Sequence, residues 1–322
     1  MWTTQGPPRA AAFGKVPRMG DFLRVGSVGP SGEAFKQWIE HGLGLAESGT
    51  DGSWLRSYQA GATYAFVFRP PSPGDMLVGV IKPSIDSVGR RFPLAVYAPA
   101  FLDVRVPWPH VLPLVFGDFL DAAATVLQRA DSVSDAAEMH ALLQQLPPPH
   151  RGDGDLQASE YDAWTASTAV AHAWGVVYGA EQAVSAAQAV HTIAEAVAPF
   201  RGDYAPRTKL GLRLPLGPGG VAAAVFWLDT IGRLAQTPGL VRNCFWCFDG
   251  TSGSAIVQLG DVPASTLAQL WAPNADSEHL CDLTSPSTID VARYLTRLPG
   301  PLSEALQSSR ALVREFLERL SV

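Results

Sequence analysis

Cysteine is scarce in this sequence, with three residues among 322. An odd, small number in a long chain does not suit a disulfide framework and indicates a reducing compartment. No apolar stretch reaches the roughly 20 residues that a membrane-spanning helix needs. Residues 1–12 also lack the positively charged segment and following apolar run of a signal peptide. The sequence therefore predicts a cytoplasmic protein that is not inserted in a membrane.

Charged residues are sparse as well. Asp, Glu, Lys and Arg make up 17% of the chain, and the net charge is −6. Nucleic-acid binding needs clustered Lys and Arg that displace counterions from phosphates, so this composition disfavours a nucleic-acid partner. Hydrophobic residues, at 47%, are numerous enough to bury a substantial core. We therefore expect a globular protein.

Several signatures of catalysis are missing. The seven histidines form no His-x-x-x-His pair, which disfavours a metallohydrolase. The sequence has no Gly-x-Ser-x-Gly nucleophile turn. Gly14 and Lys15 are adjacent, but the upstream glycine and the metal-binding hydroxyl of a phosphate loop are absent. These absences predict a protein without a nucleotide or other cofactor.

Two polar runs stand out in the first third of the chain. Phe13–Phe22 contains Gly-Lys-x-Pro-x-x-Gly-Asp-Phe, and Lys82–Leu94 contains Pro-Ser-x-Asp-x-Val-Gly-Arg-x-Phe-Pro-Leu. Fixed charges among Gly and Pro, with Phe near the end, are typical of anchored loops that brace neighbouring segments or bind a partner. An aromatic series lies between the two runs, namely Phe35, Trp38, Trp54, Tyr58, Tyr64 and Phe66.

Together, the two runs and the aromatic series resemble the TagF (ImpM) family of bacterial type VI secretion accessory proteins. The resemblance extends over roughly residues 13–99. It implies a layered α/β/α domain. It also implies a post-translational repressor that holds back assembly of the secretion apparatus by binding its forkhead-associated (Fha) scaffold, alongside a threonine kinase and phosphatase.

The order of helical and strand patterns predicts an α/β sandwich with a mixed, partly antiparallel sheet. We expect a tail over residues 1–12 and a single α/β unit over 13–322, divided into a motif-bearing part (13–110), a mainly helical part (111–200) and a part with strands and helices (201–322). Expected helices lie at 30–42, 54–60, 113–129, 134–146 and in the second half of 158–198; expected strands lie at 11–13, 62–69, 76–81, 93–99, 208–216, 221–228, 243–248 and 255–259. The last four strands are expected to form two hairpins, with turns at 217–220 and 249–253.

Cysteine and histidine near the C-terminal strands offer one metal candidate. Cys244, Cys247, His279 and Cys281 have the number and type of ligands that zinc takes. The apolar run that holds Cys244 and Cys247 is strand-like, however, and would point these two side chains to opposite faces. Burial in the core is therefore the favoured interpretation, and we expect no metal.

The charged and aromatic residues of the two runs have three interpretations. A carboxylate beside arginine in a rigid loop usually pairs or caps backbone N–H groups, which favours bracing. The alternatives are a protein-binding rim and, less favoured, a hydrolase that uses Asp21 or Asp86. We expect the two loops to lie close together, with Arg18→Glu or Arg90→Glu abolishing partner binding. The candidate residues are Lys15, Arg18, Asp21, Phe22, Arg24, Ser84, Asp86, Arg90 and Arg91.

We therefore expect a non-enzymatic regulator of type VI secretion. A structural or assembly component of the secretion apparatus is the alternative. Such a component would co-purify stoichiometrically with the apparatus, whereas a regulator would associate reversibly with a signalling scaffold.

Overall fold

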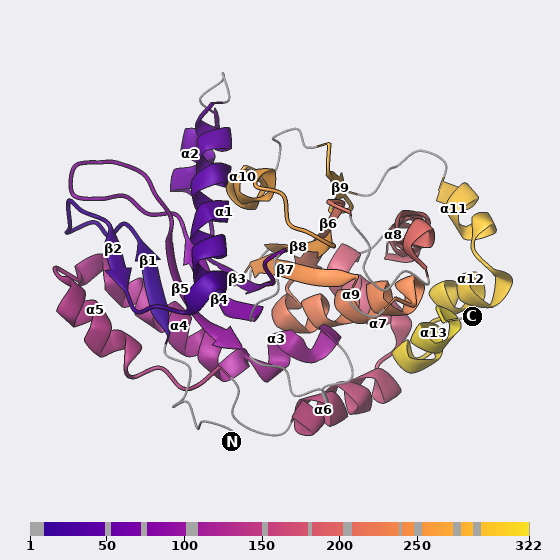
Figure 1. Ribbon diagram of the computed structural model, residues 1–322. Helices are drawn as coiled ribbons and strands as arrows, with labels where there is room; N and C mark the ends of the chain where they lie inside the picture. Colours follow the sequence, from indigo (N-terminus) through magenta and orange to yellow (C-terminus); the bar gives the residue numbers. More distant parts are fainter. Residues whose placement is uncertain are drawn as a thin grey trace.

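The computed structural model describes residues 10–48, 53–71, 76–100, 109–149, 154–179, 182–201, 208–237, 240–247, 253–272, 278–285 and 291–321. Within these residues nine strands form one sheet in the order β2-β1-β5-β4-β3-β7-β8-β6-β9. Helices cover both faces of the sheet (Figure 1). This arrangement is the expected layered α/β fold with a mixed sheet. The first nine residues of the expected tail and residues 249–252 of the second expected turn lie outside the described part.

The first five strands come from the motif-bearing part of the chain. β1 pairs antiparallel with both β2 and β5, and β4 pairs antiparallel with both β5 and β3. Their β-branched and aromatic residues favour an extended backbone, and every residue of β3 and β5 is buried. The bounds are β1 Ala11–Gly14, β2 Leu23–Val25, β3 Tyr64–Phe68, β4 Met76–Lys82 and β5 Leu94–Ala100.

The remaining strands extend the same sheet. β7 pairs with β3, so the sheet runs without a break from the first part of the chain into the last. β7 and β8 form the expected antiparallel pair, and β8 also pairs with β6. β9 is the one parallel neighbour in the described sheet and lies beside β6. The bounds are β6 Gly211–Gly217, β7 Val241–Cys247, β8 Gly253–Leu259 and β9 Leu280–Asp282.

One face of the sheet is covered by α1 (Gly29–Glu47), α2 (Ser53–Gln59) and α10 (Ser265–Trp271). The core beneath them is rich in aromatic rings that lie within stacking or edge-to-face distance of one another. Phe35 and Trp38 of α1, for example, have ring centroids 5.1 and 5.6 Å from that of Phe68. Burial of Phe35, Trp38 and Ile39 on one side of α1 follows the helical spacing seen in the sequence.

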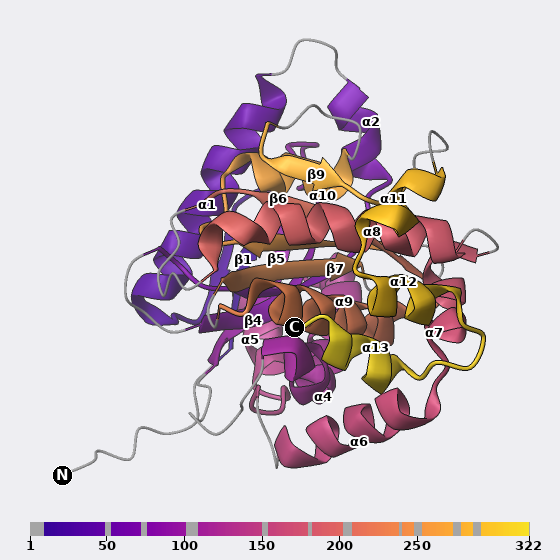
Figure 2. The same ribbon diagram turned by 90° about the vertical axis from the view of Figure 1, so that its right-hand side faces the viewer.

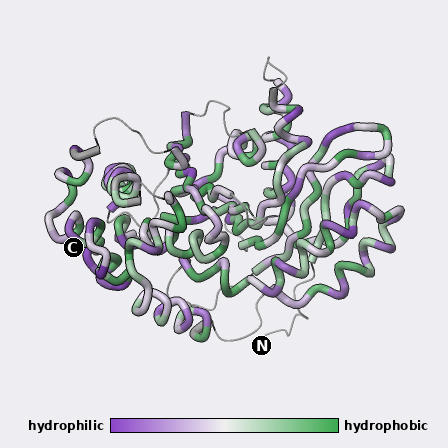
Figure 3. The backbone as a smooth tube through the Cα atoms, turned by 180° about the vertical axis from the view of Figure 1, so that it is seen from behind, coloured by the Kyte–Doolittle hydropathy of each residue, from purple (hydrophilic) through white to green (hydrophobic). Residues whose placement is uncertain are grey.

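The other face is covered by more helices and has a mainly aliphatic core of Val, Leu and Ala. α8, α12 and α13 pack beside α7 and α9 near the β6 side of the sheet (Figure 2). Hydrophobic segments run through the strands and the helices packed on them (Figure 3). The bounds are α3 Leu112–Val115, α4 Gly117–Arg129, α5 Ala136–Leu143, α6 Gly154–Ser167, α7 Val170–Tyr178, α8 Gln182–Val197, α9 Gly220–Ala235, α11 Val291–Arg297, α12 Gly300–Gln307 and α13 Val313–Arg319.

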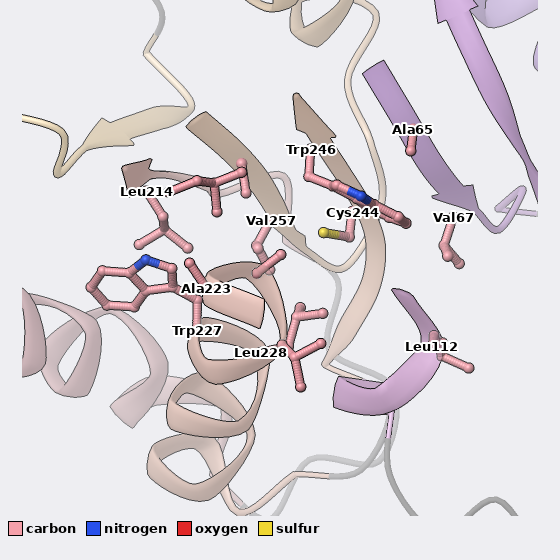
Figure 4. Close-up of a cluster of buried hydrophobic side chains, with 14 of the residues drawn as sticks. Ala65, Val67, Leu112, Leu214, Ala223, Trp227, Leu228, Cys244, Trp246 and Val257 are labelled. Atoms are coloured by element: carbon pink, nitrogen blue, oxygen red, sulfur yellow. The ribbon is translucent and has the colours of Figure 1, made fainter. Parts of the chain in front are cut away.

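The expected strand at 221–228 is wrong, because these residues belong to α9. The turn at 217–220 therefore leads from β6 into a helix, and only the β7–β8 pair of the two expected hairpins exists. Every residue from Ala223 to Ile231 is buried, so the run carries no exposed face from which the helical period can be read. Trp227 and Leu228 pack from α9 against the strands that carry Leu214, Val257 and Trp246 (Figure 4).

Candidate functional site

The two polar runs form neighbouring loops at one end of the sheet. The first connects β1 to β2 and the second connects β4 to β5; β1 and β5 pair, which brings the loops together (Figure 1). Gly14 sits where they meet, with φ of +142°. A Cβ atom at this position would lie 2.1 Å from the carbonyl oxygen of Pro93. Only glycine fits such a close approach of two backbones.

Backbone hydrogen bonds fix the shape of both loops. The amide of Ser87 donates to the carbonyl of Met19 at 3.0 Å, which ties the second loop to the first. Within the second loop, Ile85 and Arg91 form an antiparallel bridge, and the Asp86 amide donates to the Arg90 carbonyl at 3.0 Å. The loops are therefore an ordered unit and not two independent connections.

Asp86 lies at the centre of this unit and is only 2% exposed. One carboxylate oxygen, Oδ2, accepts hydrogen bonds from Lys15 Nζ and from Arg90 Nε, the latter at 2.7 Å. The other, Oδ1, accepts from the amides of Val88 at 3.1 Å and Arg90 at 2.8 Å. We call Asp86, Lys15 and Arg90 the Asp86 cluster. The four groups that donate to Asp86 occupy the lone-pair sites of its carboxylate.

These donors determine the protonation state of Asp86. Burial by itself would raise the pKa of the carboxyl, because it penalises the charged form. The hydrogen bonds from Lys15, from Arg90 and from the Val88 amide outweigh burial and hold the pKa of Asp86 well below its ordinary value. The surroundings of Asp86 therefore favour its ionised form at neutral pH.

The Asp86 cluster is tied to the rest of the protein by two further contacts. Arg90 Nη2 donates to the carbonyl of Gly20 in the first loop. Tyr58 of α2 meets Ser84 at the start of the second loop: its hydroxyl donates to the Ser84 carbonyl at 3.1 Å, and the Ser84 amide lies 3.0 Å from the same hydroxyl. Burial raises the pKa of Tyr58, so the hydroxyl keeps its proton.

Three phenylalanines pack where the loops meet the sheet. The ring centroids of Phe13 and Phe92 are 5.3 Å apart, and that of Phe22 lies 4.8 Å from Phe92. The ammonium of Lys15 lies 4.9 Å from the Phe22 ring centroid, and the guanidinium of Arg24 lies 5.9 Å from it. Cations at these distances are attracted to the ring face. Phe22 is thus held in place although it is 40% exposed.

The outer side of the loops carries the other candidate residues. Arg18, Asp21 and Arg24 are exposed, and so are the apolar side chains of Ile85 and Val88. Arg91 is half-buried. Its positive charge lowers the pKa of Tyr58, but burial of the hydroxyl has the larger, opposite effect. Arg90 is exposed as well, but it belongs to the Asp86 cluster. We call the other exposed residues of this set the loop surface; it consists of Arg18, Asp21, Phe22, Arg24, Ile85 and Val88.

The cysteine and histidine set does not come together as a zinc site. Cys244 lies in the aliphatic core on one face of the sheet, and Cys247 lies in the aromatic core on the other. Burial raises the pKa of the Cys244 thiol to about 12, which disfavours the thiolate that binds metal. Within the described ranges no group of three or more His, Cys, Asp or Glu side chains is arranged to hold a metal ion.

A second polar cluster escaped the sequence reasoning. Asp229 of α9 accepts from Tyr161 Oη at 2.9 Å and from Arg233 Nε at 2.7 Å. It lines a cavity of about 210 Å³ together with His110, whose pKa is lowered by burial. The sequence carries one signal for this cluster, the i, i+4 spacing of Asp229 and Arg233, but that spacing has this meaning only in a helix and the preceding apolar run favours a strand.

The fold and the loops together define an α/β protein with a helix-covered mixed sheet and two interlocked polar loops. Residues 11–146 match the TagF N-terminal domain, which is type VI secretion system-associated. This match covers the part of the chain that carries the two motifs, and over these residues it confirms the resemblance to the TagF family that the motifs indicate.

The crystal structure of PA0076 from Pseudomonas aeruginosa PAO1 is similar, with 17% sequence identity and a TM-score of 0.46, over 83% of this chain and 96% of that one. No curated protein matches the chain. None of the described helices is both long and apolar enough to cross a membrane.

Proposed function

We propose that this protein is a non-enzymatic, cytoplasmic regulator of a type VI secretion system, which represses the apparatus after translation by binding its forkhead-associated scaffold. The TagF N-terminal domain supports the association with type VI secretion. The single observation that favours binding is the loop surface: an ordered unit that presents arginines and apolar side chains to solvent. Aromatic residues and arginine dominate the energetically important positions of protein interfaces.

The environment of Asp86 supports a role other than hydrolysis. A catalytic carboxylate needs a free lone pair and a pKa near the working pH. Asp86 has donors at both oxygens and a pKa held below its ordinary value. Asp21 is exposed on the outer side of the loops. The Asp86 cluster therefore braces the loops, and the loop surface is the part that meets the partner.

The test is capture of the scaffold by the tagged protein from cells that express the secretion cluster. Arg18→Glu combined with Arg24→Glu reverses two charges of the loop surface. Arg297→Glu combined with Arg310→Glu is the matched control, because both residues are exposed and lie outside the loops. We expect the native protein and the control to recover the scaffold and the loop variant to lose it, with all three folded by circular dichroism.

Failure of the native protein to recover the scaffold would contradict the proposal. Stoichiometric recovery of other components of the apparatus, without the scaffold, would instead indicate an assembly component. Arg90→Glu is not suited to this test, because Arg90 bonds Asp86 and a loss of binding would not separate bracing from contact.

A further inference from the structure

Exposed apolar side chains gather in the two loops. The described residues include five large hydrophobic side chains that are exposed, and three of them are Phe22, Ile85 and Val88. Val88 is the most exposed of the five, at 69%. Single exposed apolar residues are normal, whereas a group of them on one ordered unit indicates an interaction site.

The charge of the loops is opposite to that of the chain. Residues 14–24 and 83–93 contain five basic and two acidic residues, a net charge of +3, whereas the chain as a whole carries −6. One of the two acidic residues is Asp86, which is buried and faces Lys15 and Arg90. Solvent therefore meets Arg18, Arg24 and the exposed part of Arg90, whose side chain is 60% exposed although it bonds Asp86. Asp21 is the exposed acidic residue of the two loops.

The surface is also pre-organised. Phe22 is held between Phe13 and Phe92, and Arg24 lies over the rings of Phe13 and Phe22 at 5.5 and 5.9 Å. Side chains that are already fixed lose little conformational entropy when a partner binds. Rigid aromatic and arginine side chains are therefore available as anchors for a partner.

We propose that the loop surface binds an acidic segment of a partner protein that also carries apolar side chains. This inference rests on the proposed function and names the chemistry that its partner must present. An anionic membrane would also attract arginine, but the chain's overall negative charge would oppose binding to a membrane surface. An acidic protein segment meets both requirements, since its carboxylates pair with the arginines and its apolar groups cover Phe22 and Val88.

Two fluorescein-labelled peptides test the chemistry by fluorescence anisotropy. The first alternates Glu with Leu around a central Phe, and the second has Gln in place of every Glu. We expect the Glu peptide to bind at least about tenfold more tightly than the Gln peptide, with the advantage shrinking as salt is added. Arg18→Glu with Arg24→Glu should remove that advantage, and Val88→Ser should weaken both peptides. The Arg297→Glu, Arg310→Glu control should behave like the native protein.

Equal affinity for the two peptides, or no effect of reversing Arg18 and Arg24, would overturn the inference. Binding only to vesicles that contain phosphatidylglycerol would overturn it in favour of a membrane. Capture of the scaffold without binding of the acidic peptide would leave the proposed function standing and this inference wrong. Arginine-dependent peptide binding without capture of the scaffold would support the inference and contradict the scaffold as partner.

Discussion

The Asp86 cluster and the loop surface are built from the same two loops and the same kinds of residue, yet their environments differ. Lys15 is 3% exposed and bonded to Asp86, whereas Arg18, three residues later, faces solvent. Asp86 and Asp21 show the same contrast between a buried and an exposed carboxylate. The surroundings of a charged residue decide whether it can brace the loops or is available to bind a partner. The sequence of the motif alone does not distinguish the two roles.

This difference has an energetic consequence. A buried ion pair often adds little net stability compared with apolar residues, but removal of one partner leaves an uncompensated buried charge. Removal of the neighbour of an exposed charge has no such cost, because water solvates that charge. The cost of a substitution in the loops therefore depends on which of the two regions it alters.

Asp86→Ala should destabilise the protein most, because it leaves Lys15 buried without a counter-charge and the amides of Val88 and Arg90 without an acceptor. Asp21→Ala removes the same charge from an exposed position and should change the free energy of unfolding by no more than about 0.5 kcal/mol. Urea unfolding followed by tryptophan fluorescence measures both. Equal effects of the two variants would mean that the Asp86 cluster does not brace the loops.

Gly14→Ala should lower the free energy of unfolding by about 2 kcal/mol or more, since it adds both backbone strain and a steric clash with Pro93. Gly89→Ala is the matched control. Gly89 also has positive φ, at +85°, but no atom lies near the added Cβ, so only the strain of about 1 kcal/mol applies. Thermal unfolding of both variants distinguishes the two costs; a control as unstable as Gly14→Ala would exclude the clash as the cause.

Tyr58→Phe removes the hydroxyl that meets both backbone groups of Ser84. Because the site is buried, we expect a loss of about 1–3 kcal/mol in the free energy of unfolding. Hydrogen exchange should localise the effect by faster exchange of amides in the second loop. Unchanged exchange in that loop would show that Tyr58 does not hold it.

Acidification should weaken the Asp86 cluster. The pKa of Asp86 is lower in the folded protein than in the unfolded chain, so between the two values the unfolded chain binds more protons. The contribution is therefore complete above the unfolded pKa and is lost as the pH falls below about 4. The stability difference between the native protein and Asp86→Asn should shrink from pH 7 to about pH 3; a difference independent of pH would contradict this assignment.

Much of the fold could be predicted from local sequence. The aromatic and β-branched runs predict β3, β4 and β5 within a few residues. Helical spacing predicts the start of α1 and the burial of Phe35, Trp38 and Ile39, but α1 continues past the expected end at 42 to Glu47. Local patterns do not predict α9, because its run from Ala223 to Ile231 is buried on every side and shows no amphipathic period, and because Phe226 and Trp227 favour strands.

The candidate site was predictable only as a set of residues. Lys15 and Asp86 are 71 positions apart, and they meet because β1 pairs with β5. Strand pairing depends on long-range packing that local patterns do not specify. Arg90 bonds Asp86 within the second loop, whereas its bond to the Gly20 carbonyl of the first loop joins residues 70 positions apart. The sequence therefore predicts that these residues brace the loops or bind a partner, but it does not predict which residue has which role.

The pairing of β3 with β7 limits which fragments of the protein can fold without an exposed sheet edge. The part that matches the TagF N-terminal domain ends at residue 146, whereas β7 begins at Val241. A fragment that stopped at the family boundary would leave β3, with all five of its residues buried in the intact sheet, as an open apolar edge. Such edges recruit other strands and lead to aggregation. The boundary of the recognised domain is therefore not a boundary at which the sheet can end, and studies of the motif loops call for the whole chain.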